Sequence, residues 1–400
     1  MLKARISTIA DSTGDRVGDT KVFHTLNGMR GIAAIAVVIW HAPSFFGFGL
    51  GSNYLAVDLF FVLSGFVLAH AYEARFEQGM GVSGFMRLRF IRLFPLLSLG
   101  IAMMLAGIVA GWSSGVHLGW TLKPLILCTA LNILFIPAPP LTGSALFPLD
   151  IPAWSLFLEL TVNLLYVAFW RYLSNRVLIA ILAAASVALI ICAGVFGDLG
   201  GGWEWPTLGV GFARVLFSFP AGVLIYRRTR NLRLIRSNGL LVIAAMVLVF
   251  AMNPVVSRVA FDVVAVVLVF PALVIAGSLA RPPARVVPLY TFLGATSYGV
   301  YAIHDPLIRI VNGIVVHRMG DNMKHFAPWA GFGLTAGLLV LVWLLDRHFD
   351  APMRRWLLSL HVRPAPIAEM PSKVVGAAGV EGLRGEIRQY GTEASYHHPR

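Results

Sequence analysis

Cysteine and acidic residues are scarce in this chain. Its 400 residues include only 2 Cys and 19 Asp or Glu, against 32 Lys or Arg. Cys128 and Cys192 both lie in apolar surroundings, which offers neither a disulfide framework nor a metal-ligand pair. Charged residues make up only 13% of the chain, whereas 58% are hydrophobic, so a soluble globular domain is excluded and a membrane protein is indicated.

Several functional signals are also missing. No glycine-rich phosphate loop of the Walker type occurs, which argues against a nucleotide used as an energy source. Residues 1–25 are polar and lack an apolar region with a cleavage site, so we expect no cleaved signal peptide. The net charge of +13 lies mostly between apolar runs, where it indicates orientation and contact with anionic lipid rather than nucleic acid.

Long apolar runs dominate the sequence instead. They continue over about twenty residues, as membrane helices do, and do not alternate as barrel strands do. We therefore expect an all-α polytopic membrane protein. Eleven runs can be read, at roughly 28–45, 54–72, 93–112, 121–137, 153–171, 176–196, 207–226, 238–252, 260–280, 289–311 and 327–346.

Loop charge decides which runs cross the membrane. If all basic clusters are cytoplasmic, an even number of crossings separates Arg92 from Arg171, although three runs lie there. The run 121–137 is short and ends among prolines, so it is interpreted as re-entrant or interfacial. This leaves about ten transmembrane helices with both termini cytoplasmic. The expected domains are a polar arm at 1–25, a membrane domain at 26–348 and a disordered tail at 363–400.

The first run, LNGMRGIAAIAVVIWH from Leu26 to His41, carries only two ionisable groups, Arg30 and His41. The eleven steps between them come to about three helical turns and a rise of about 16 Å, so both side chains should lie on one face. Arg30 could simply reach a lipid headgroup while His41 bonds a neighbouring helix. Because ionisable groups inside a membrane are costly, a functional role is favoured.

The second run returns to the depth of His41 after a turn at residues 47–51. Asp58 could therefore orient the imidazole of His41, or it could only cap its own helix. Ser64, in FFVLSGF, offers either a close helix contact or space for a slender ligand.

Arginines gather at the start of the third span, in RLRFIRLFP. Arg87, Arg89 and Arg92 fit a phosphate-rich ligand, because guanidinium groups bind phosphate bidentately. Ordinary orientation signalling is the alternative interpretation.

Two later runs carry further polar groups. In IPAWSLFLEL, Trp154 suits the membrane interface and Glu159 lies about 9 Å in from the outer end of the helix. In SYGVYAIHDPL, Tyr298 and His304 lie in an apolar helix that Pro306 should kink. A lone His304 would be structural, but its depth agrees with that of His41, Asp58 and Glu159, which favours one shared polar cavity.

These motifs, in this order and spacing, resemble the acyltransferase 3 family of membrane-integral O-acyltransferases. The pieces are LNGMRGIAAIAVVIWH, VDLFFVLSGF, the RLR of Arg87 to Arg89, PAWSLFLE and SYGVYAIH, and the resemblance spans about residues 22–346. Asn27 departs from the pattern, since the family usually has Asp there. An asparagine can still cap the helix, but an acidic role at this position is lost.

The resemblance implies ten spans and transfer of an acyl group, usually acetyl, from cytoplasmic acyl-CoA to a hydroxyl of a carbohydrate or glycolipid. It assigns family roles to Arg30, His41, Arg87, Arg89 and Glu159. The expected protein is a multi-pass enzyme of the cell (inner) membrane. Its expected partners are acyl-CoA, a cell-surface glycan, membrane lipid and separate glycan-assembly proteins, with no metal and no nucleic acid.

The expected catalytic residues are His41 as general base or transient acyl carrier, with Asp58 or Glu159 orienting it. Donor binding is expected from Arg30, Arg87, Arg89 and Arg92. Substrate binding is expected from Ser64, Trp154, Tyr298 and His304. A transporter or flippase for a glycolipid or anion is the alternative, but no internal repeat supports it. A non-catalytic partner in polysaccharide assembly is a third hypothesis.

Overall fold

The structure is a computed structural model that describes residues 22–115, 119–141, 143–254, 256–319 and 323–360. Of these residues, those up to Leu357 form one compact unit, and residues 358–360 belong to a second one. The expected disordered tail and most of the expected N-terminal arm lie outside the described residues.

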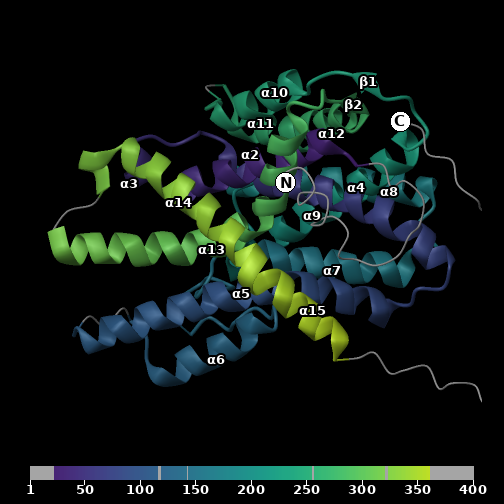
Figure 1. Cartoon of the computed structure of the whole chain (residues 1–400). Coiled ribbons are helices and arrows are strands. Elements are labelled where there is room, and N and C mark those ends of the chain that lie inside the picture. Colours follow the sequence, from purple (N-terminus) through teal and green to yellow (C-terminus); the bar gives the residue numbers. More distant parts are fainter. Residues whose placement is uncertain (1–21, 116–118, 142, 255, 320–322, 361–400) are drawn as a thin grey trace, which may run out of the picture. The chain divides into compact units, whose positions relative to one another are not determined.

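The described chain is almost entirely helical (Figure 1). Its elements in order are α2 (His24–His41), α3 (Pro43–Phe46), η2 (Asn53–Leu55), α4 (Ala56–Glu77), α5 (Val82–Ser113), α6 (Leu122–Ile133), α7 (Ala153–Phe169), α8 (Asn175–Phe196), η3 (Trp205–Thr207), α9 (Leu208–Thr229), β1 (Ile235–Arg236), α10 (Leu240–Ala251), α11 (Arg258–Val264), η4 (Ala265–Val269), α12 (Phe270–Leu279), β2 (Ala280–Arg281), α13 (Val287–Met319), η5 (Met323–Phe326), α14 (Trp329–Leu345), η6 (Asp346–Asp350) and α15 (Ala351–Ser359). The two-residue strands β1 and β2 pair in parallel.

Each of the eleven apolar runs coincides with a helix or a continuous helical stretch. Among the described residues, seven helices are long and apolar enough to cross a membrane, which confirms an all-α membrane protein. The helix at 122–133 is about 18 Å long, too short to cross alone, as expected for the run 121–137. Three runs that were counted as crossings, those of α2, α7 and α10, are not among these seven helices either, and α10 has the same length as α6. The number of ten spans therefore stays a prediction.

Helix pairs in the core approach closely at glycines. A Cβ atom placed on Gly31 of α2 would lie 2.3 Å from Cβ of Leu293 on α13. Between α4 and α9, a Cβ on Gly65 would lie 2.0 Å from the carbonyl oxygen of Phe219. Because small residues let membrane helices pack backbone to backbone, these contacts bring α2 against α13 and α4 against α9.

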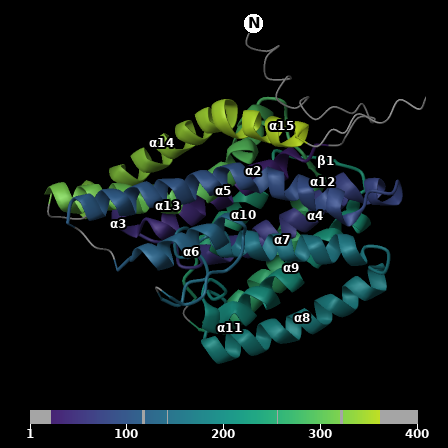
Figure 2. The same ribbon diagram turned by 90° about the horizontal axis from the view of Figure 1, so that it is seen from below.

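The helices α2, α4, α5, α7 and α13 all contribute residues to the polar interior. In Figure 2, α14 and α8 lie on opposite sides of the bundle. The expected hairpin of the first two spans is present, because Asn53 donates a hydrogen bond of 2.8 Å to the carbonyl oxygen of Ala36. The first helix begins at His24, with Phe23 at the cap position, so Asn27 lies inside the helix and does not cap it. The helix α13 continues through Pro306.

Candidate functional site

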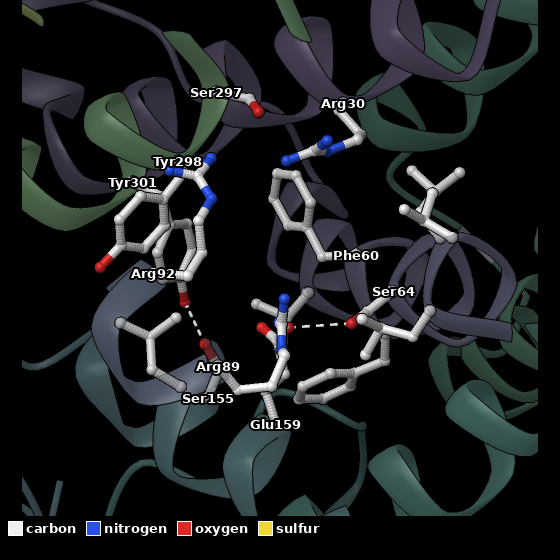
Figure 3. A pocket seen from close by; sticks show the side chains of 16 residues that line it. Arg30, Phe60, Ser64, Arg89, Arg92, Ser155, Glu159, Ser297, Tyr298 and Tyr301 are labelled. Atoms are coloured by element: carbon white, nitrogen blue, oxygen red, sulfur yellow. Dashed lines mark hydrogen bonds and ion pairs between the residues drawn. The ribbon is translucent and has the colours of Figure 1, made fainter. Parts of the chain in front are cut away.

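A polar pocket of about 200 Å³ lies among the core helices (Figure 3). Its ionisable lining includes Arg30 from α2, Arg89 and Arg92 from α5, and Glu159 from α7. Three arginines and one glutamate leave this lining with a formal net charge of +2. Its other polar side chains are those of Ser64, Ser155, Ser297, Tyr298 and Tyr301. A cavity of this charge, sunk among apolar helices, is suited to an anionic or strongly polar ligand.

Glu159 lies within the pocket, but its carboxylate is held by other groups. Arg89 donates a hydrogen bond of 2.5 Å to Glu159 Oε1, and Ser64 donates one of 2.9 Å to the same oxygen. Glu159 therefore fixes the position of the Arg89 side chain and does not contact His41. The Glu159 and Arg89 side chains are 18% and 14% exposed, so water screens their ion pair only in part.

Arg30 contributes one of the three guanidinium groups of the pocket. Its guanidinium points into the pocket (Figure 3), and it makes no ion pair or hydrogen bond with any residue that the structure describes. The Nε atom of Arg89 is also buried without an acceptor among the described residues. Because buried donors are normally paired, these two groups identify places where a bound ligand can accept hydrogen bonds.

Arg92 is oriented by its neighbours. Its guanidinium lies over the ring of Tyr298, 5.3 Å from the ring centroid, and 3.6 Å from a carboxylate oxygen of Asp350. The Tyr298 hydroxyl donates to the carbonyl oxygen of Leu93, so this ring is part of the pocket wall. Asp350 closes the π-helical turn η6, which also brings Arg354 to within 3.0 Å of it.

Arg87 does not line the pocket, contrary to its expected pairing with Arg89. Its guanidinium donates to the carbonyl oxygen of Leu357, at 3.5 Å. The reason is helical geometry, since residues two apart point about 200° away from each other, whereas Arg89 and Arg92, three apart, share a face. The two pocket arginines of α5 are therefore Arg89 and Arg92.

His41 and His304 are brought together at the far end of the α2–α13 contact. Their ring centroids are 4.9 Å apart, and His304 Nε2 lies 3.2 Å from His41 Nδ1. The ring of Tyr301, which lines the pocket, lies 5.8 Å from that of His304. Since Arg30 lines the pocket beside Ser297 and Tyr298 of α13, Arg30 and His41 both face this helix, as their spacing predicts.

Asp58 does not orient His41. Its carboxylate is fully buried and accepts three hydrogen bonds from Arg214 of α9, the shortest 2.7 Å long. Trp154, expected to bind substrate, is also buried and lies 5.4 Å beneath the Arg214 guanidinium. Both residues therefore contact Arg214 and do not line the pocket. Sequence reasoning missed Arg214, although an arginine within the apolar run 207–226 indicates a buried acidic partner.

Sequence reasoning also missed Asp150. Asp150, in the loop before α7, is buried, and neither of its carboxylate oxygens has a hydrogen-bond partner among the described residues. Nearby, Asp305 accepts a hydrogen bond from the backbone N–H of Ile151 and forms an ion pair of 3.0 Å with Arg309. Burial, together with the charge of Asp305, raises the pKa of Asp150 well above its usual range.

Comparison with known proteins shows which family the chain belongs to. A family model described as an acyltransferase domain, that of the acyltransferase 3 family, matches residues 23–347. The chain is also similar to a Rhizobium radiobacter protein named "Protein 2 in picA locus", with 42% identity over 183 residues, or 44% of this chain and 96% of the relative. No solved structure matches. The chain therefore belongs to the acyltransferase 3 family and is a multi-pass membrane acyltransferase.

Proposed function

We propose that the protein transfers an acetyl group from cytoplasmic acetyl-CoA to a hydroxyl of a cell-surface carbohydrate or glycolipid, in the cell (inner) membrane. The observation that carries this proposal is the joining of a cationic pocket to a histidine pair through the ring of Tyr301. The shared family supplies the acyl-transfer chemistry. The arginine pocket would bind the anionic donor, and the histidine pair would activate the weakly nucleophilic acceptor hydroxyl.

The donor would bind at the arginines. A cavity of about 200 Å³ is smaller than the usual ligand pocket of about 300–1,000 Å³, so it suits the narrow pantetheine arm rather than a whole nucleotide. Arg30 and Arg92 would attract the phosphates, and the free Nε–H of Arg89 would donate to an oxygen of the donor. Glu159 and Ser64 would hold Arg89 in place.

The reaction would take place beside His41. The acceptor hydroxyl oxygen forms a bond to the thioester carbonyl carbon, and the carbon–sulfur bond breaks. His41 takes the hydroxyl proton as general base and returns it to the departing thiolate, so charge and protons balance. Transient acylation of His41 followed by transfer to the hydroxyl balances equally and uses the same residues.

Donor binding by matched arginine variants tests this proposal. Arg89→Lys keeps the charge but loses the planar donor set, so the affinity for acetyl-CoA should fall by at least about tenfold, as expected for a lost hydrogen bond to a charged group worth about 1.5–3 kcal/mol. Arg87→Lys is the control, because Arg87 lies outside the pocket, and it should bind within about twofold of the wild type. Isothermal titration of purified protein gives both values.

Equal affinities in the two variants would remove Arg89 from donor binding. Loss of affinity in Arg87→Lys alone would place the donor on the side of α5 that faces α15, and would contradict the pocket as donor site.

A further inference from the structure

Both ring nitrogens of His304 are occupied in a site that excludes water. The residue has no exposed surface. Its Nδ1 atom lies 2.7 Å from the carbonyl oxygen of Tyr301 and 3.1 Å from that of Val300, while Nε2 faces His41. All of these polar contacts of His304 are with protein groups, which does not suit the substrate-binding role expected for it.

The carbonyl oxygens determine where the protons of both rings lie. A carbonyl can only accept a hydrogen bond, so the Nδ1 atom of His304 must carry a proton. The Nδ1 atom of His41 lies 3.0 Å from the carbonyl oxygen of Val37 and must carry one for the same reason. The one Nδ1 proton of His41 is then shared between the carbonyl oxygen of Val37 and the unprotonated Nε2 of His304, which lies 3.2 Å from Nδ1.

The opposite assignment is unfavourable. If His304 donated from Nε2, both of its nitrogens would carry protons and a fully buried imidazolium would result. No carboxylate contacts its ring among the described residues, because the neighbouring Asp305 is engaged by Arg309. A buried charge without a partner costs several kcal/mol, so His304 stays neutral and accepts.

We infer that His304 is a positioning residue that fixes His41 in the Nδ1–H tautomer and leaves Nε2 of His41 as the nitrogen that takes the acceptor's proton. The inference rests on the proposed function. It gives His304 the orienting role that an aspartate has in a hydrolase triad, but with a neutral acceptor. When His41 is protonated at Nε2, its Nδ1–H still donates to His304, so the ring does not turn during the reaction.

Two substitutions separate this role from simple packing. His304→Gln places an amide oxygen near the position of Nε2 and can still accept from His41, whereas His304→Leu fills similar space without an acceptor. The leucine variant should lose about a hundredfold in kcat, the size of a typical misplacement effect, with KM for acetyl-CoA within about twofold. The glutamine variant should regain at least about tenfold of that loss.

The inference is overturned if the leucine variant keeps kcat within about threefold of the wild type, or if glutamine is no better than leucine. A loss confined to KM would return His304 to a substrate-binding role and would equally overturn it.

If these variants do not fold, the tautomers can be measured by NMR on the wild-type protein. This measurement does not require an active enzyme. In ¹⁵N spectra of histidine-labelled protein, a coupling across a nitrogen–nitrogen hydrogen bond should join a protonated Nδ1 to an unprotonated Nε2. A coupling from a protonated Nε2, or none, contradicts the assigned tautomers. Because this result does not depend on turnover, it separates failure of the inference from failure of the proposed function.

Discussion

At the scale of single residues, the ion pair of Arg214 and Asp58 shows how a charge is kept inside this bundle. Both side chains are almost completely buried, and Arg214 also donates to the carbonyl oxygens of Gly201 and Tyr54. Removing one partner leaves the other charge buried alone. Arg214→Ala should therefore destabilise the protein by about 3–5 kcal/mol.

The destabilisation is measured by heating the purified protein in detergent and recording the fraction that remains monodisperse at each temperature. Arg233→Ala, at an exposed arginine, is the control and should melt with the wild type. If both variants melted alike, the pair would contribute little to stability.

Asp150 is expected to make stability depend on pH. The folded chain raises the pKa of this carboxyl well above its ordinary value of 3.8, through burial and the charge of Asp305, with Arg309 acting in the opposite direction. Between the unfolded and the folded pKa the folded state binds more protons, so this group lowers stability as pH rises through that interval. Asp150→Asn removes the titration.

The difference in melting temperature between Asp150→Asn and wild type should therefore be small near pH 4 and grow in favour of the variant towards neutral pH. Because the other titrating groups are the same in both proteins, their effects on the melting temperature cancel in this difference. A difference that shrank as pH rose would mean that the Asp150 carboxylate has a stabilising partner.

At the scale of elements, the parallel packing of α2 on α13 sets the relation between pocket and histidine pair. Arg30 lies beside Ser297 and Tyr298, and His41 meets His304, because eleven residues of α2 make nearly three turns. One alanine inserted between Ala33 and Ala34 would rotate the two ends by about 100° relative to each other. Acetyl transfer should fall at least about a hundredfold while the protein still accumulates in the membrane.

The control is one residue inserted after Phe48, in the loop that follows α3, which leaves α2 unchanged. The rate of acetyl transfer is measured for both insertion variants. Activity in the helix insertion together with inactivity of the loop insertion would mean that Arg30 and His41 do not act as a unit.

At the scale of the whole molecule, we predict how many helices cross the membrane. Helices α6 and α10 are both about 18 Å long, shorter than a hydrocarbon core of about 30 Å. Basic-loop parity nevertheless predicts that residues 75–92, 171–176 and 227–236 all face the cytoplasm. Reporter fusions in each segment should give cytoplasmic signals, with residues 200–205 outside. An outside signal at 171–176 would show that the run 121–137 crosses.

Periodicity and depth predicted the parts of the site that depend on one helix. The shared face of Arg30 and His41 follows from helical spacing, and Glu159 does lie in the pocket. Partners between helices could not be predicted in the same way. Asp58 lies at a depth suited to His41, but only the packing of α4 against α9 shows that Arg214 takes its carboxylate. For Arg87, the helical angle was available in the sequence and already separates it from Arg89.

Transfer of labelled acetyl from acetyl-CoA by purified protein tests the central proposal most directly. Wild type and His41→Ala are compared in the presence of cell-surface glycan, with free thiol and acetylated glycan both measured. Wild type should release thiol and label the glycan in equal amounts. His41→Ala should do neither, at least about a hundredfold below wild type, while still binding acetyl-CoA. Glycan labelling by His41→Ala at the wild-type rate would contradict the account.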